Sequence, residues 1–221
     1  MCFSASVSYS TAAVLVSTGL YALQQARRLQ FPYWLLALVP VLFGMQQGFE
    51  GRVWQELDAG RAGAAVPFAL GFHFFSHFLW LWWFPLCSTL LEPGKLRKRL
   101  FLGLGIFGAL AGGLVYFTIL FHPDWMSVEV RQHSINYRVS STYRGPFSIP
   151  FPASALYAVI VLVPLLFSSH RHIRIFGGLI ALSVVLASLA YGYAFVSVWC
   201  FFAAVLSLYL VYMIRTLAKG P

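Results

Sequence analysis

Two histidines four residues apart, His73 and His77, are the pair of side chains in this sequence best suited to chemistry. Residues at this spacing lie on one face of an α-helix, so both imidazoles point the same way, one turn apart. The same His-x-x-x-His spacing holds zinc in many helical metal sites. The pair predicts a metal site; the alternative interpretation is packing or hydrogen bonding between helices.

A carboxylate and two amides form a second group of candidates. Gln46, Glu50 and Trp54 recur at intervals of four, which places them on one helix face, and Gln47 flanks the same stripe. Polar groups within a membrane span are costly and often mark function. We expect Glu50 to act as a general base or as an additional metal ligand, with Gln46 and Gln47 orienting a substrate or the ligands. The alternative is a structural carboxylate paired with Arg52 or a histidine.

Cys2 is the remaining candidate ligand: residue 2 is small, so we expect the initiator methionine to be removed, which would leave Cys2 as the first residue. A terminal cysteine offers a thiolate and an α-amine, which can chelate one metal ion together. We therefore expect Cys2, His73 and His77 to hold zinc, with a fourth position left for water. An ordinary terminal residue is the alternative for Cys2.

The elements that must position these residues are membrane helices. Of the 221 residues, 60% are hydrophobic and 10% are charged, and the ranges 62–91 and 175–214 contain no charged residue. Soluble domains carry about 25% charged residues, and about 20 apolar residues of helix cross a bilayer. A soluble enzyme and a disordered chain are excluded, and the odd count of three cysteines argues against a disulfide framework. The sequence predicts an all-α polytopic membrane protein.

Hydropathy, with proline, glycine and charge as boundaries, predicts a single domain over 1–221 with seven transmembrane helices. The weakest boundary is Tyr191-Gly192-Tyr193, the one break in a long apolar run. A polar, turn-rich outer loop is expected at 122–150, either as a lid or as a loop folded over the helix ends. The expected spans lie near 7–26, 33–54, 65–90, 99–121, 151–169, 174–193 and 196–215.

The distribution of basic residues predicts an outside amino terminus and an inside carboxyl terminus. With that orientation, ten basic residues and one acidic residue lie inside, whereas five of each lie outside. We therefore expect the basic surplus, a net charge of +9, to anchor the protein to an anionic inner leaflet. We expect no nucleic-acid partner. The second and third spans become antiparallel neighbours, so the polar faces that carry Glu50 and the His73/His77 pair are expected to meet in the outer half of the membrane.

Two motifs recur in a known group of proteins: Met-Cys-Phe-Ser at residues 1–4 and Gln-Gln-x-x-Glu-Gly-x-x-Trp at residues 46–54. In both, the chain resembles a family of small, uncharacterised bacterial multipass membrane proteins. The resemblance implies no activity, but it implies that the family's recurring polar positions include Cys2, Gln46, Gln47 and Glu50. The architecture is also similar to the seven-helix zinc hydrolases that include alkaline ceramidases and adiponectin-type receptors. Here the last helix carries no histidine, so that likeness is a precedent for zinc chemistry inside a bundle.

These observations favour an intramembrane zinc enzyme that activates water for hydrolysis or hydration of a lipid-like or small neutral substrate. The site is expected to open to the outer, periplasmic face of a bacterial cytoplasmic membrane, with the lipid bilayer as a partner. One alternative is a metal-binding protein without catalysis, acting as a sensor, a carrier or a structural site. The other is a proton-coupled transporter that uses Glu50 and the two histidines. The sequence does not specify an oligomeric state.

Overall fold

The computed structural model describes residues 4–131, 133–139, 153–191 and 195–219, and this part of the chain is predominantly helical. The first half contains α1 (Ala5–Ala26), α2 (Phe31–Asp58), α3 (Ala62–His73), a π-helical segment η1 (Phe74–Leu79), α4 (Trp80–Leu91) and α5 (Lys95–Phe121). A 3₁₀ turn, η2 (Pro123–Trp125), leads into strands β1 (Met126–Arg131) and β2 (Ser134–Val139). The second half contains α6 (Ala153–Leu166), α7 (Arg171–Tyr191), α8 (Phe195–Leu206) and α9 (Leu208–Ala218).

Within the described residues, each of the seven expected spans overlaps a helix or a run of helical segments, and α6 is shorter than the span expected at 151–169. Five of these stretches are long and apolar enough to cross a membrane: 5–26, 62–91, 95–121, 171–189 and 195–218. The expected break at 191–193 falls where α7 ends and α8 begins, and residues 192–194 lie outside the described residues. The chain is therefore a predominantly helical protein, with several helices that are long and apolar enough to cross a membrane.

Local sequence explains where the first helices begin and end. The Ser4 hydroxyl caps α1 by accepting a hydrogen bond from the Val7 amide at 3.4 Å. Pro32 lies in the first turn of α2, where its missing N–H costs nothing. Between α2 and α3, Gly60 adopts a positive φ of 71°, which favours glycine. Pro32 and Gly60 thus mark the start and the end of α2, which pairs with α3 and carries several of the candidate residues.

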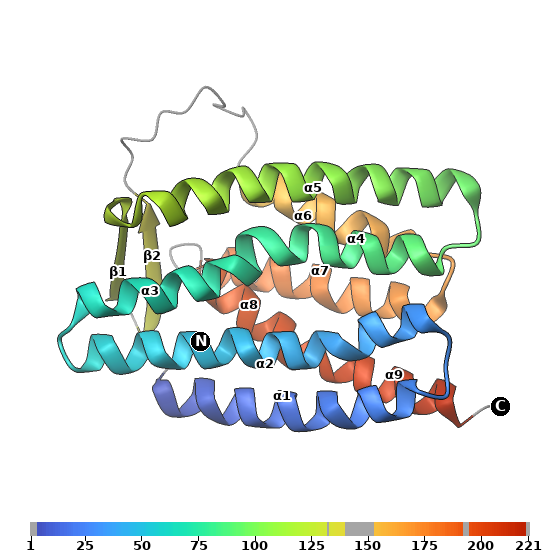
Figure 1. Cartoon of the computed structure of the whole chain (residues 1–221), viewed down its shortest axis with the longest axis horizontal. Helices are drawn as coiled ribbons and strands as arrows, with labels where there is room; N and C mark the ends of the chain where they lie inside the picture. The colour runs from blue at the N-terminus through green and yellow to red at the C-terminus, as the bar shows by residue number, and fades with distance from the viewer. Residues whose placement is uncertain (1–3, 132, 140–152, 192–194, 220–221) are drawn as a thin grey trace.

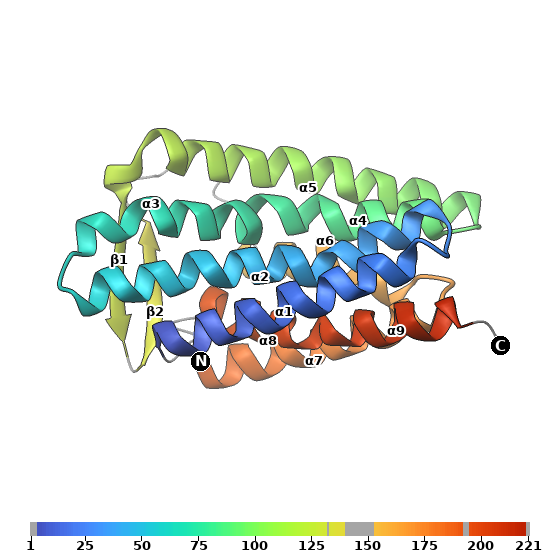
Figure 2. The ribbon, with the colours of Figure 1, turned by 60° about the horizontal axis from the view of Figure 1, so that its bottom comes forward.

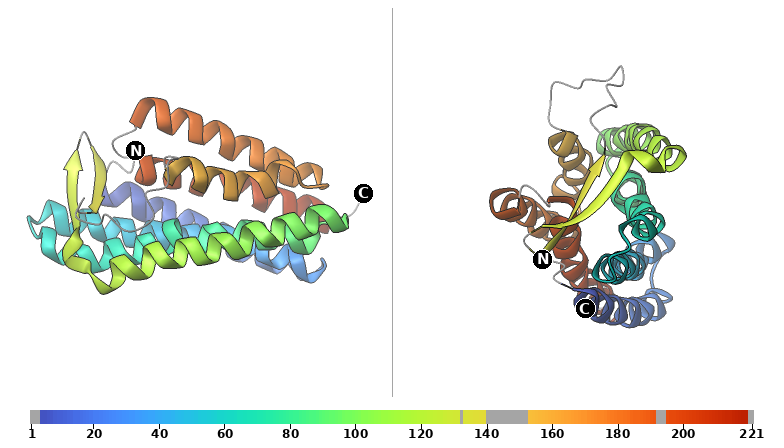
Figure 3. Two further views of the ribbon diagram at one scale, coloured as in Figure 1. Left: turned by 90° about the horizontal axis from the view of Figure 1, so that it is seen from above. Right: turned by 90° about the vertical axis from the view of Figure 1, so that its left-hand side faces the viewer.

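The helices lie roughly along one common axis, and the β-hairpin crosses one end of the bundle (Figures 1 and 3). Helix α1 packs against α2 and also contacts α9 (Figure 2). Helix α4 packs against α5 and α6, and α7 packs against α6 and α8. The largest apolar core runs along the bundle and includes a stacked pair, Phe43 and Trp80, whose ring centroids lie 4.1 Å apart.

A two-stranded antiparallel hairpin occupies part of the expected outer loop at 122–150, and sequence analysis did not predict it. Ser127 pairs with Arg138 and Val128 with Tyr137, and Met126, Val128 and Ile135 are buried. These side chains form a second apolar core with residues at the ends of α2 and α3. The turn-rich stretch at 140–146 lies outside the described residues.

Hydrogen bonds join the α4–α5 turn to the α6–α7 turn at the opposite end of the bundle. The Glu92 side chain is fully buried and accepts from the Ser169 amide at 2.8 Å and from the Ser169 hydroxyl at 2.6 Å. Arg97 lies 3.6 Å from the same carboxylate, and a ring nitrogen of His170 lies 2.8 Å from the Leu91 carbonyl oxygen. The two turns are therefore held together by a buried charged group.

Candidate functional site

The carboxylate of Glu50 is fully buried in the bundle, with an exposed fraction of 0%. The Ser197 hydroxyl of α8 donates to Glu50 Oε1 at 2.6 Å, and Gln47 Nε2 donates to Glu50 Oε2 at 3.1 Å. The expected polar stripe is real, because Gln46, Gln47, Glu50 and Trp54 are all buried. The structure thus fixes both carboxylate oxygens and ties the stripe to α8, which the sequence did not indicate.

Gln46 connects the same stripe to α4. Its side-chain oxygen accepts a hydrogen bond from Trp80 Nε1 at 2.9 Å. Its Nε2 is buried and has no hydrogen-bond partner of ordinary geometry among the described residues, but it lies beside the Cys200 thiol. Cys200 is three residues after Ser197 on α8, so Gln46 and Glu50 face one side of that helix.

The two histidines share one face, as the spacing predicted. Their rings stack with centroids 4.6 Å apart and planes 20° apart. His73 Nδ1 lies 2.8 Å from the Ala69 carbonyl oxygen and therefore donates to it, and His77 Nδ1 lies 2.9 Å from the Ser76 hydroxyl. With Nδ1 engaged on both rings, Nε2 is the nitrogen left for a ligand or a proton, as in many metal-binding histidines.

The backbone around these rings departs from α-helical geometry. The π-helical segment η1 begins at Phe74, directly after His73, and contains Ser76 and His77. Segments of this kind are rare and are frequently found at functional sites. Gly112 of α5 packs against it, because a Cβ there would lie 2.5 Å from the His77 carbonyl oxygen. The segment that presents His77 is therefore held closely by the neighbouring helix.

The hairpin supplies an aromatic neighbour for the histidines. Tyr137 of β2 lies edge-on to His73, with ring centroids 4.6 Å apart and planes at 81°. The same Tyr137 ring stacks on Phe72 at 5.1 Å. Tyr137, from a segment that the sequence had placed in a loop, therefore covers one side of the histidine pair.

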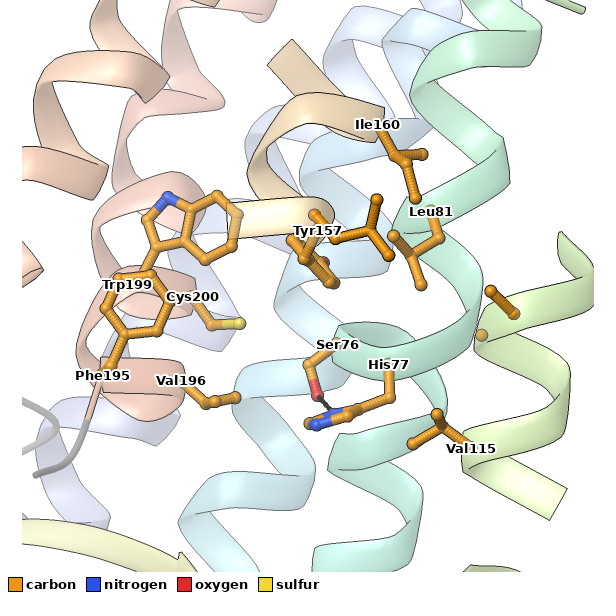
Figure 4. Close-up of a pocket in the computed structure, with 13 residues that line it drawn as sticks. Ser76, His77, Leu81, Val115, Tyr157, Ile160, Phe195, Val196, Trp199 and Cys200 are labelled. Atoms are coloured by element: carbon orange, nitrogen blue, oxygen red, sulfur yellow. Dashed lines mark hydrogen bonds between the residues drawn. The ribbon is translucent and has the colours of Figure 1, made fainter. Parts of the chain in front are cut away.

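A cavity of about 250 Å³ lies beside this cluster (Figure 4). It is partly open, and α5, α6 and α8 form most of its wall. Ser76 and His77 lie at one end of the view, Ile160 at the other, and Cys200 points its sulfur into the space between them. The remaining lining is mostly apolar, and Tyr157 and Trp199 add a hydroxyl and an indole N–H. Such a space suits a small molecule that is largely apolar and has one polar end.

The proposed zinc ligands can be compared with the structure only in part. Within the described residues, no three His, Cys, Asp or Glu side chains gather closely enough to hold a metal ion. Cys2 lies outside the described residues, so the set of Cys2, His73 and His77 stays a prediction. The two histidines supply a matched pair of Nε2 atoms, and any further ligand has to come from elsewhere.

Sequence reasoning missed four residues that surround the candidates: Trp80, Tyr157, Ser197 and Cys200. Trp80 belongs to an aromatic run that resembles a membrane-interface belt, yet it is buried and bonded to Gln46. Ser197 and Cys200 are isolated in a long apolar segment, so no spacing marks them. A helical projection of α8 would have shown only that they share a face.

Comparison with known proteins identifies a family but no activity. A family described only as a family of unknown function, DUF6629, matches residues 1–220. No curated protein and no solved structure matches the chain. The match confirms the resemblance to an uncharacterised family and extends it over nearly the whole sequence. The protein thus belongs to the family of unknown function DUF6629.

Proposed function

We propose that this protein has seven transmembrane helices, with its amino terminus on the periplasmic side of a bacterial cytoplasmic membrane. Five spans come from the apolar stretches, and α2 and α6 supply the other two. Helix α2 has 28 residues, about 42 Å at 1.5 Å per residue, which exceeds the bilayer core. The surplus of basic residues at the end that contains Glu92 supports the orientation. The hairpin and the histidines then lie toward the outer side.

We further propose that the protein is an intramembrane zinc enzyme that activates water to hydrolyse or hydrate a lipid-like or small neutral substrate. The observation that carries the proposal is the fully buried carboxylate of Glu50, oriented through both oxygens, at the level of the histidine pair. Phe49, the residue before Glu50, packs against Gly71 of α3, which lies two residues before His73. Glu50 and the histidine pair therefore lie at a similar position along the bundle axis. Burying a carboxylate inside the membrane costs free energy, so such a residue usually has a function.

The residues divide the work as follows. His73 and His77 would offer Nε2 to zinc, because their Nδ1 atoms are already engaged. Cys2 would complete the set, since it lies two positions before Ser4, which caps the helix that packs along α2. Bound zinc lowers the pKa of a water molecule toward neutrality. Glu50 would accept the proton from this water, and the hydrogen bonds from Ser197 and Gln47 would hold its carboxylate in a fixed orientation.

The proposal is tested by elemental analysis of the full chain purified in detergent without chelator. We expect near-stoichiometric zinc in the native protein and none in a His73→Ala/His77→Ala variant. The matched control is His122→Ala/His133→Ala, which removes two histidines near the hairpin and should retain zinc. Cys2→Ala should lower the zinc content, whereas Cys87→Ala, at a buried core cysteine, should not.

The Glu50→Gln variant separates the roles of the carboxylate. Retained zinc with lost turnover of lipid esters and amides identifies Glu50 as the base, and lost zinc would contradict that role. Stoichiometric zinc without any turnover in the native protein would favour a metal-binding protein without catalysis. No zinc even after reconstitution would overturn the proposal, and proton uptake by Glu50 in liposomes would then test the transporter.

A further inference from the structure

We propose that the cavity beside His77 binds the aliphatic chain of a carbonyl compound that enters from the bilayer, such as a fatty ester or amide. This inference names the substrate class and rests on the proposed function. It is carried by the composition of the cavity wall, by the place where the cavity reaches the surface, and by the positions of its few polar groups.

The wall of the cavity selects an apolar chain. Leu81, Ile160 and Trp199 line it, and its volume of about 250 Å³ lies just under the ~300 Å³ at which drug-sized sites begin. A slender chain fits such a space better than a ring system or a lipid headgroup, because few polar side chains are present to replace lost hydration. The rest of the molecule would stay in the membrane.

The cavity reaches the lipid-facing surface between α5 and α6. Val115 of α5 lines the cavity and is also 45% exposed, and Leu156 of α6 is a half-buried lining residue. The exposed residues next to this point are apolar, including Leu114 on α5 and Val159 on α6. An apolar surface on membrane-spanning helices faces acyl chains, so the entrance opens to lipid and not to water.

The polar groups are placed to meet a carbonyl. Ser76 and His77 lie at one end of the cavity, and the Cys200 sulfur points into it (Figure 4). Behind Cys200 lie Gln46, whose Nε2 lacks a partner of ordinary geometry among the described residues, and Glu50. A chain directed toward Ile160 would leave its carbonyl beside His77. The reacting bond would then lie on the side of the cavity where the proposed chemistry takes place.

The inference is tested by photolabelling the full chain in nanodiscs with a fatty amide that carries a diazirine on its chain. We expect cross-links on peptides that contain Tyr157 and Trp199. Val115→Trp, which fills the entrance, should reduce them about tenfold, as for a loss of 1.4 kcal/mol of binding free energy. Ile106→Trp, at an exposed site on the same helix that does not line the cavity, should leave them unchanged.

Competition separates recognition of the carbonyl from filling of an apolar space. Excess unlabelled fatty amide should abolish the cavity cross-links, and an alkane of the same length should not. Equal competition by both compounds, or equal labelling in the two tryptophan variants, would overturn the inference. Zinc content measured on the same samples keeps the two proposals apart. Cross-linking of the cavity residues in protein without zinc would overturn only the proposed zinc chemistry. Bound zinc without cross-linking of these residues would overturn only the proposed chain-binding site.

Discussion

Ser197 and Glu50 are 147 residues apart in the sequence and share a 2.6 Å hydrogen bond inside the bundle. The bond joins α8, in the last apolar run, to the polar stripe of α2 in the first quarter of the chain. It also gives an isolated serine a definite purpose, which is to orient one oxygen of a buried carboxylate.

We expect Ser197→Ala to lower the free energy of unfolding by about 2 kcal/mol, because it removes a hydrogen bond to a buried charged or polar group. Ser207→Ala is the matched control, since Ser207 is equally buried but bonds to the carbonyl of Ala204, three residues earlier at the end of α8. Denaturation in mixed detergent micelles measures both. Equal losses of unfolding free energy in the two variants would show that the hydrogen bond to Glu50 stabilises the protein no more than a bond to a backbone carbonyl.

The indole of Trp80 provides a second test of the polar stripe. Trp80→Phe keeps an aromatic ring but removes the donor to Gln46 Oε1. We expect this change to lower the free energy of unfolding by about 1–3 kcal/mol. Trp82→Phe is the control, because the Trp82 N–H has no hydrogen-bond partner among the described residues. The same denaturation assay should show a larger loss for Trp80→Phe, and the reverse order would contradict the assignment.

Close approach of α5 to the π-helical segment depends on Gly112. We expect Gly112→Ala to destabilise the protein by about 1–3 kcal/mol, because the new methyl group meets backbone and cannot be accommodated without moving a helix. Gly103→Ala, on the same helix with open space around it, should instead stabilise by about 0.5–1 kcal/mol. Thermal denaturation of both variants in detergent gives the comparison, and opposite signs are the expected outcome.

The buried Glu92 predicts a pH dependence of stability. Burial raises the pKa of its carboxyl, but the hydrogen bonds from Ser169 and the charge of Arg97 outweigh burial and hold the pKa below 4.5. Because the pKa is lowered on folding, the stabilisation is complete above pH 4.5 and is lost as the pH falls through the lowered pKa. Glu92→Gln should therefore lower the melting temperature at neutral pH, and its difference from the native protein should shrink below pH 4.5.

A surface ion pair supplies the control for Glu92. Glu129 lies 3.1 Å from Arg138 on the hairpin and is about half exposed, so Glu129→Gln should change stability by less than about 1 kcal/mol at any pH. A difference between native protein and Glu92→Gln that stays constant down to pH 3 would refute the assigned role of the carboxylate.

The helical architecture was predictable because it depends on quantities that a sequence shows directly. A bilayer requires long apolar stretches, and the boundaries are marked by residues such as Ser4, Pro32 and Gly60. The common face of Gln46 and Glu50, and that of His73 and His77, follow from helical periodicity alone. These features were therefore confirmed where the structure describes them.

Partners across the bundle were not predictable, because periodicity says which residues share a face and not which helix that face meets. For this reason the sequence did not predict the hydrogen bond from Ser197 to Glu50 or the one from Trp80 to Gln46. The hairpin did leave a signal, since apolar residues alternate at Met126, Val128 and Val130. Reading the segment only for its polar character concealed that period of two.

The exposed position of Val115, at the edge of the cavity, has a consequence for how affinity is measured. A molecule that arrives through this side of the protein is dissolved in the membrane before it binds, so occupancy follows its mole fraction in the lipid. Doubling the lipid at constant total ligand would halve that mole fraction and weaken apparent binding, although nothing in the protein has changed. Titrations on this chain therefore need ligand-to-lipid ratios in place of aqueous concentrations.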